Sequence, residues 1–476
     1  MSWVCCALVP MYIMYIAATA APARVVTLDE ALESVRRNNI TWQSLAEFAN
    51  QAQAGQDIGW GLLFPKVQVQ GQWLHLGERH TPDLSSLTTL IGGLMAMNPA
   101  TAAQMGGGGS LSDVFDNMVP ASNTLSAAFN VVIPVLNAPA IFMIRGANDR
   151  YQAALQKIGY GREQLLFSVA KAYYGLVTLQ SLLEVANHSI ASAQAHHKQN
   201  SVRQALDSAT LLEVKRAELE VVKAQSQKAK LAASYGKAQA AFAYLTGLNG
   251  SFTVVEPRLA LPAGDRALED WVQVAKSERR DLVAARLDEM AAEHEANQGL
   301  AQYLPSVNLV GQGKLDNAEK QRFDDDPFSW TVLATATVDV WDGGIKAAQY
   351  DLAKSKLVQA RLATEDLRRQ IESSVTAAKQ ALDDARAARD LAEKQLEVAH
   401  TTEGLTQSSE QAGVVTNLEV IDANTIVFAS EAQALSARLD ESMAVLDLVS
   451  ATGGSVPTGS GAAPPAGEVT AKASAD

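Results

Sequence analysis

The chain repeats itself at an offset of about 206 residues. Apolar residues on alternating spacings of four and three run from Ile371 to Ala399, with Arg389 the one polar member, and subtracting 206 gives a second apolar series from Leu165 to Ala193. This 3.5-residue average is typical of a coiled-coil seam. The segments at 416–420 and 210–214 align at the same offset. A tandem duplication predicts two similar structural units. The apolar members of the two seams are Ile371, Val375, Ala378, Leu382, Ala385, Ala392, Leu396 and Ala399, and Leu165, Val169, Ala172, Leu176, Leu179, Leu183, Ala186, Ile190 and Ala193.

Each repeat also contains two stretches in which apolar and polar residues alternate. Alternation with a period of two predicts half-buried strands, at about 65–76 and 124–134 in the first repeat and about 305–315 and 329–341 in the second. The last strand is followed by Asp342, Gly343 and Gly344, which predict a sharp strand-exit turn because glycine tolerates unusual backbone dihedrals. The corresponding place in the first repeat has Asn-Ala-Pro at 137–139.

These patterns predict an order of segments. The first repeat spans 24–247, a Pro- and Gly-containing connector spans 248–267, and the second repeat spans 268–452. Each repeat is expected to begin with a helical pair and to end in a long helical hairpin, whose arms of about fifty residues would reach on the order of 75 Å. Residues 77–123 form an expected long loop, and the Gly-, Ser-, Pro- and Ala-rich stretch 453–476 an expected disordered tail.

The first 23 residues are expected to be a signal peptide. An apolar run from Trp3 to Ile16 holds the chain's two cysteines and is followed by small residues, with cleavage expected after Ala20 or Ala23. No Lys or Arg precedes the run, which departs from the usual pattern. A transmembrane anchor is the competing interpretation, but about 14 apolar residues are too few to cross a bilayer.

Composition and local motifs argue against nucleic-acid binding and catalysis. A net charge of −13 and a pI near 5.1 do not provide the basic face that nucleic acid requires. His196 and His197 are adjacent on a helix and point to different sides, so they predict a polar face rather than a metal pair. The four glycines at 106–109 lack the Gly-Lys-Ser/Thr of a phosphate loop, and Asp324–Asp326 indicates a solvated acidic loop. No enzyme, cofactor or metal is expected.

The strands point to a membrane. Ten residues with one apolar and one polar face match a tilted transmembrane β-strand, and Trp73, Trp330 and Trp341 near the strand ends suit interfacial anchors. Four strands cannot close, and an open edge in lipid leaves amides unsatisfied. Two copies would supply eight strands and three would supply twelve, enough to leave a lumen. The alternative is a periplasmic coiled-coil adaptor or scaffold protein that never enters a membrane.

Several motifs follow one another in a specific order and spacing. They are Phe64-Pro65, Arg280-Asp281-Leu282, Leu304-Pro305, Val338-Asp339-Val340-Trp341-Asp342-Gly343-Gly344, Gln411-Ala412-Gly413 and Asn417-Leu418-Glu419-Val420-Ile421-Asp422-Ala423. Through these motifs, residues 27–452 resemble the TolC-like outer-membrane efflux and secretion channels. The resemblance implies a homotrimer in the outer membrane of a Gram-negative bacterium, with a 12-stranded barrel and a periplasmic α-helical barrel. It implies a passive exit duct of a tripartite efflux or type I secretion system, exporting drugs or proteins and docking with a periplasmic adaptor and an inner-membrane pump.

The same resemblance implies a channel entrance. It places Gly413 in the turn at the tip of the second hairpin, and Glu419 and Asp422 among the acidic residues that line the periplasmic constriction. These two carboxylates are three residues apart and hence on one helix face, and three copies would form an acidic ring that favours cations. An ordinary solvated helix face is the alternative.

The pattern departs from the family near the tips. Where the family often has a tyrosine and a basic residue around the tip glycine, this chain has Glu410 and Val415. In the first repeat, Asp207 stands at the place of the tip glycine. Glu213 and Arg216 stand at the places of the two acidic residues, so the first tip is not equally acidic.

Overall fold

The computed structural model describes residues 24–75, 89, 123–248, 250, 252–257, 266–316, 328–412 and 414–457. The expected signal peptide at 1–23, almost all of the loop 77–123 with its four glycines, Asp324–Asp326, Gly413 and the tail beyond 457 lie outside these residues. The chain divides into two compact units, described separately below. The sheet unit comprises Asn50–Ala154 and Ala285–Thr364, and the hairpin unit comprises Met1–Ala49, Leu155–Ala284 and Glu365–Asp476.

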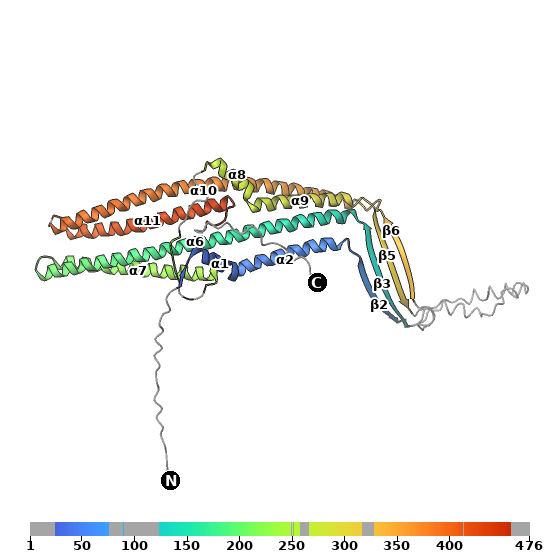
Figure 1. Cartoon of the computed structure of the whole chain (residues 1–476), viewed down its shortest axis with the longest axis horizontal. Helices are drawn as coiled ribbons and strands as arrows, with labels where there is room; N and C mark the ends of the chain where they lie inside the picture. Colours follow the sequence, from blue (N-terminus) through green and yellow to red (C-terminus); the bar gives the residue numbers. More distant parts are fainter. Residues whose placement is uncertain are drawn as a thin grey trace, which may run out of the picture. The chain divides into compact units, whose positions relative to one another are not determined.

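The sheet unit contains one antiparallel sheet with the order β2-β3-β5-β6 (Figure 1). The strands are β2 (Lys66–His75), β3 (Asn123–Leu136), β5 (Ser306–Asp316) and β6 (Phe328–Thr337), so each repeat contributes two neighbouring strands. The alternation predicts β6 as far as Trp341, and this is wrong. Ser306 begins β5 opposite Thr337, so residues beyond Thr337 have no strand to pair with.

One face of the sheet is apolar. The strand register places Val69, Phe129, Gly313 and Trp330 in one line across the four strands. Val69 is 80% exposed and Trp330 is 71% exposed, so no layer of the described residues covers this face. Gly313 leaves room for the Phe129 ring, which a Cβ at this position would meet at 2.1 Å. Among the described residues, no helix has the length and apolarity needed to cross a bilayer.

Glycines let helices approach closely just before the strands of both repeats. In the first repeat α2 (Ile40–Gly61) lies against α6 (Ala138–Ala205), and a Cβ on Gly59 would lie 3.2 Å from the Ala147 Cβ. In the second, α9 (Arg280–Ala301) lies against α10 (Ile345–Gln411), and a Cβ on Gly299 would lie 3.2 Å from the Tyr350 Cα. A larger side chain at either position would push the two helices apart.

The hairpin unit is built on two long helical hairpins (Figure 1). Helix α6 pairs with α7 (Leu211–Thr246), and α10 pairs with α11 (Asn417–Ala451). The helices have 68 and 36 residues in the first hairpin and 67 and 35 in the second, as a duplication requires. The expected arms of about fifty residues are therefore wrong. Each outgoing helix begins next to a strand of the sheet unit, whereas each returning helix ends beside the core of the hairpin unit.

The seam predicted from the 3.5-residue repeat is confirmed. Every apolar member in both repeats is buried or half-buried, including Val169 and Val375, which are fully buried. The polar exception, Arg389, lies half-buried, and its Nη1 donates to Glu441 Oε2 on α11 at 2.6 Å. The charged residue is thus tolerated in the seam because its partner lies on the facing helix.

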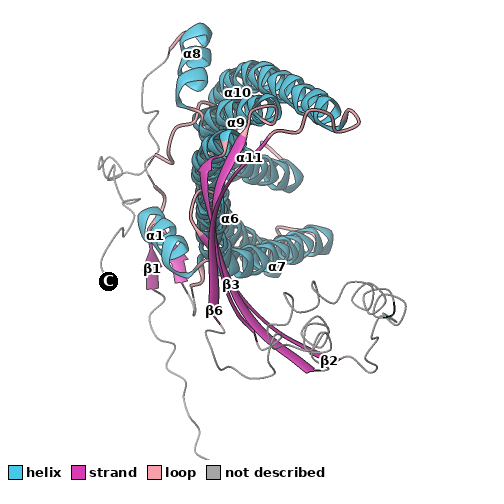
Figure 2. Ribbon diagram, turned by 90° about the vertical axis from the view of Figure 1, so that its right-hand side faces the viewer, coloured by secondary structure: helices cyan, strands magenta, loops and turns pink. Residues whose placement is uncertain are grey.

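The main hydrophobic core of the hairpin unit includes residues of β1 (Arg24–Val26) and of the long helices. Figure 2 shows β1 and α1 (Leu28–Asn38) beside each other. Strand β1 pairs in parallel with β4 (Phe252–Val254), which lies inside the stretch expected to be a connector. The Tyr173 hydroxyl lies 2.9 Å from the Val26 carbonyl oxygen and 2.7 Å from that of Val255, and holds the two strands together. Helices α1 and α8 (Leu268–Glu278) pack on this core.

The sequence predicts disorder from residue 453 onward, and this start is too early. Residues 453–457 are ordered, and the Val456 side chain is 8% exposed in the same core. Gly453 has a φ of 79°, and a Cβ there would lie 3.0 Å from the Arg279 backbone. The composition of the tail did not reveal that its first residues have an apolar surface to pack against.

Candidate functional site

The two hairpin tips begin their returning helices in the same way. At the first tip the Thr210 backbone N–H donates to Glu213 Oε2 at 2.6 Å, and the Glu213 backbone N–H donates to the Thr210 hydroxyl at 3.3 Å. This capping box satisfies helix N–H groups that otherwise lack partners. The Thr210 N–H also lowers the pKa of the Glu213 carboxyl below its usual range.

Glu419 has the same role at the second tip. The Thr416 backbone N–H and hydroxyl both donate to Glu419 Oε2, at 2.6 and 3.2 Å. The side chain is exposed at the start of α11, and its carboxylate is engaged with Thr416. A Thr-x-x-Glu spacing before an apolar run is the sequence signal for such a cap, and it is present at both tips.

Asp422 lies one turn further along α11 and is also exposed. It lines a groove of about 520 Å³ in the hairpin unit, to which α6, α7, α10 and α11 contribute. The structure thus places the two expected entrance carboxylates differently. Glu419 caps its helix, and Asp422 faces a polar groove. The ionisable groups that share this groove with Asp422 are His188, His196, Glu220, Lys223, His400, Glu403 and Glu431.

The histidines of the groove connect neighbouring helices. His196 Nε2 hydrogen-bonds to Asn417 Oδ1 and so joins α6 to the first residue of α11. The His400 imidazole lies 3.6 Å from Glu403 and 3.5 Å from Glu431, and so joins α10 to α11. Within the described ranges, no three His, Cys, Asp or Glu side chains converge as metal ligands.

An ion pair joins the two hairpins at their tips. Arg203 Nη1 on α6 lies 3.1 Å from Glu410 Oε1 on α10, and the Glu410 side chain is only 7% exposed. Glu410 stands where the resemblance leads one to expect a tyrosine. Sequence reasoning missed this contact because the partners are 207 residues apart and no local pattern links them.

The strand-exit turn of the second repeat lies in the sheet unit, between β6 and α10. Gly343 and Gly344 have φ values of 73° and 89°, which other residues rarely adopt. Asp342 accepts hydrogen bonds from the Gly344 N–H at 3.1 Å and the Lys346 N–H at 2.8 Å, and so caps α10. Asn137 has the equivalent place in the first repeat and accepts one bond, from the Ala140 N–H at 3.2 Å.

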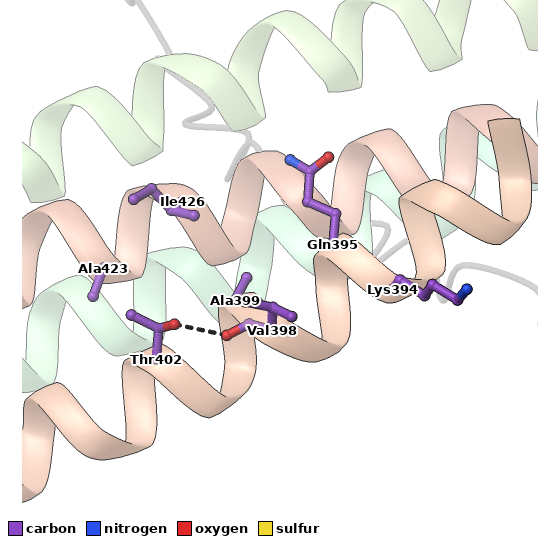
Figure 3. A pocket seen from close by; sticks show the side chains of 7 residues that line it. All are labelled: Lys394, Gln395, Val398, Ala399, Thr402, Ala423 and Ile426. Atoms are coloured by element: carbon purple, nitrogen blue, oxygen red, sulfur yellow. Dashed lines mark hydrogen bonds between the residues drawn. The ribbon is translucent and has the colours of Figure 1, made fainter.

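Helix α10 carries an exposed apolar stripe. Leu391, Val398 and Leu405 are 68%, 64% and 67% exposed and follow one another at intervals of seven residues. Figure 3 shows the groove of about 370 Å³ beside this stripe, where Ala423 and Ile426 from α11 lie near Val398. The equivalent positions on α6 are 185, 192 and 199, of which only the first is apolar. Apolar residues at intervals of seven are typical of a coiled-coil seam.

Comparisons with known proteins agree with this architecture. The family model described as "Outer membrane efflux protein" matches residues 271–454. Outer membrane protein OprJ of Pseudomonas aeruginosa is 25% identical over 321 residues, and the match covers 65% of this chain and 65% of OprJ, a little less than two thirds of that relative.

Solved structures have the same fold. The channel CusC superimposes with a TM-score of 0.73 at 17% identity, over 90% of this chain and 92% of that one. The outer membrane protein VceC of Vibrio cholerae superimposes with a TM-score of 0.71 at 16% identity, over 90% and 96% of the two chains.

With its sheet of four amphipathic strands and its two long helical hairpins, the chain has the fold of CusC and VceC. Residues 271–454 thus match the outer membrane efflux protein family, which agrees with the predicted location in the outer membrane.

Proposed function

We propose that this protein is the passive exit duct of a tripartite efflux or type I secretion system, and that it works as a homotrimer. The observation that carries the proposal is the sheet. Its apolar face is exposed, the outer edges of β2 and β6 have no partner strand among the described residues, and the sheet is too narrow to close alone. Three copies would supply twelve strands and enclose a lumen.

The heptad stripe on α10 supports assembly with further copies. Leu391, Val398 and Leu405 lie on the outgoing helix of the second hairpin, facing away from its own seam. A neighbouring subunit's helix would bury them, which removes apolar surface from water at about 25 cal/mol per Å². The same contact would extend the hairpins into a closed helical barrel in the periplasm.

The alternative of a periplasmic adaptor or scaffold protein has less support. A soluble β-domain needs a packed interior, but Val67, Val69, Trp73 and Trp330 are each at least 66% exposed on one face of the sheet. Such a face suits lipid rather than water. A duct also needs no catalytic group, so transport would be driven by a pump that the duct meets through an adaptor protein.

We place the periplasmic entrance of the duct at the hairpin tips, with Asp422 and Glu419 on its wall. Both carboxylates are exposed on the second hairpin, and three copies would form an acidic ring that favours cations. The tip turn with Gly413 would lie next to this ring. The first hairpin offers Glu213 but has Arg216 in place of the second acid, so its charge is balanced.

The test is the current through the purified full-length protein in a planar lipid bilayer. We expect ion-conducting channels whose cation preference falls, by about two- to threefold in permeability ratio, when Asp422→Asn and Glu419→Gln are combined. Glu213→Gln is the matched control, because it removes the same type of helix cap from the first tip. A water-soluble monomer without channel current contradicts the duct, and an unchanged preference in the double variant contradicts only the entrance.

A further inference from the structure

The polar face of the sheet has one level that is apolar, where a level is the set of residues that the register pairs across neighbouring strands. Along each strand, most residues on this face are Gln, Asn, Ser, Thr or Lys. Leu74, Ala128 and Pro134 are isolated exceptions at separate positions, whereas Val132, Val310 and Leu333 are exceptions on three different strands. The register brings the three together. Val132 on β3 pairs with Val310 on β5, and Val310 pairs with Leu333 on β6. We call these three residues the apolar row.

The apolar row lies between polar levels and ends at a lysine. Toward the loop side of the sheet, the next level on the same face consists of Gln68, Asn130, Gln312 and Thr331. Toward the helices, the level below it includes Pro134, Asn308 and Thr335. On β2 the fourth position of the row is Lys66, which pairs with Val132.

The row is accessible and its lysine is available. Leu333 is 53% exposed, Val132 and Val310 are half-buried, and Lys66 is exposed. Among the described residues Lys66 forms no ion pair, and Lys314, two levels away, is the other cation on this face. Neighbouring strands are about 4.8 Å apart, so three aliphatic side chains and one ammonium group span roughly 15 Å.

We propose that the apolar row and Lys66 form a binding belt for amphiphilic anions on the inner wall of the duct. This inference rests on the proposed trimeric barrel, in which the apolar face meets lipid and the polar face meets the lumen. Three copies would set nine aliphatic side chains and three lysines on a single level. An apolar body lies against the aliphatic side chains, which releases water from both surfaces, and its anionic group pairs with a Lys66 ammonium.

The belt explains why apolar residues are present on a face that water covers. Isolated apolar residues on a wet surface need no explanation, but three that coincide at one level of adjacent strands form a continuous patch. The matched cation selects the class of cargo, because a cationic amphiphile would meet a like charge there. The levels on either side are mainly polar, so a bound amphiphile has a preferred depth.

The experiment measures block of the channel current by 8-anilino-1-naphthalenesulfonate, whose aromatic body carries one sulfonate. We expect long blocking events in the unmodified trimer and events about tenfold shorter in the triple variant Val132→Thr, Val310→Thr, Leu333→Asn, a change that corresponds to about 1.4 kcal/mol. Lys66→Gln is expected to shorten them as well. Methanesulfonate, which has no apolar body, is expected to produce no block.

The matched control changes the adjacent polar level on the same three strands, with Asn130→Thr, Gln312→Thr and Thr331→Ser, and is expected to leave the block unchanged. Leu333→Met, which keeps an apolar side chain, is expected to retain the block and serves as a milder variant if the triple variant fails to assemble.

Equal block in all variants overturns the belt. A higher conductance in the triple variant with unchanged block overturns it in favour of a dewetting barrier. Absence of current in the unmodified protein contradicts the proposed duct itself.

Discussion

The two helical hairpins have nearly the same lengths and the same capped returning helix, yet they differ in the residues that face outward. The first hairpin has Asp207 at its tip, held at a φ of 55°, whereas the second has Gly413 at the aligned position. The second hairpin alone has two acidic residues in the first turns of its returning helix, and it alone carries the full heptad stripe on its outgoing helix.

This comparison separates what a duplicated unit must keep from what it can change. The seam residues and the Thr-x-x-Glu caps occur in both hairpins because each hairpin needs them to fold. The outward positions have diverged because they contact other elements. The ion pair between Arg203 and Glu410 is an example. In the alignment of the two repeats, Arg203 corresponds to Ser409 and Glu410 corresponds to Gln204, so the ion pair joins two positions that do not correspond to each other.

The largest effect is expected when the contact between the hairpins is broken. Arg203→Gln leaves the nearly buried Glu410 carboxylate without its cation, and because Arg203 is itself 42% exposed, we expect a cost of about 1–2 kcal/mol. The pair holds the two tips together, so its loss is expected to raise the open probability of single channels about tenfold in a planar bilayer.

The charge exchange Arg203→Glu with Glu410→Arg is expected to restore the original conductance pattern. Gln204→Ala, at the position aligned with Glu410, is the control and is expected to change nothing. If Arg203→Gln conducts as the unmodified channel does, the ion pair does not hold the tips.

At the strand exits an effect on stability of similar size is expected, without the effect on the channel current. Asp342→Ala removes two hydrogen bonds to backbone N–H groups of α10, whereas Asn137→Ala removes one from α6. We expect Asp342→Ala to lower the free energy of unfolding by about 1–2 kcal/mol and Asn137→Ala by about half as much. The thermal dissociation of the purified protein in detergent measures both, and equal losses would show that the second bond of Asp342 contributes nothing.

The smallest effect is expected from acid at the first tip. The pKa of Glu213 is lowered in the folded protein by its hydrogen bond from Thr210. Its contribution to stability is therefore complete above the unfolded-state pKa and is lost as the pH falls through the lower folded-state pKa. Hydrogen exchange in the first turn of α7, corrected for the intrinsic effect of pH, is expected to be about two- to threefold faster at pH 3 than at pH 6, since the group is exposed.

Glu213→Gln is expected to exchange at pH 6 at the rate that the unmodified protein reaches at pH 3. A variant that keeps the full pH dependence would show that another group is titrating at this tip.

Much of the fold follows from the sequence because it depends on local periodicity. The 3.5-residue seam from Ile371 to Ala399, the four alternating strands and the Asp-Gly-Gly turn at 342–344 are each patterns within a short stretch. The offset of 206 residues then relates the two repeats without any structural information. The same periodicity predicts the apolar face of the sheet, since side chains alternate along every strand.

The tertiary structure decided what depends on register and on long-range packing. Sequence reasoning expected equal hairpin arms and only a connector at 248–267. It did not show that each returning helix stops at the core around Tyr173, or that β4 within the connector pairs with β1. It also could not pair Arg203 with Glu410, or place Val132, Val310 and Leu333 on one level. Periodicity sets the direction in which a side chain points along its own element, but only the packing of distant elements sets which side chain it meets.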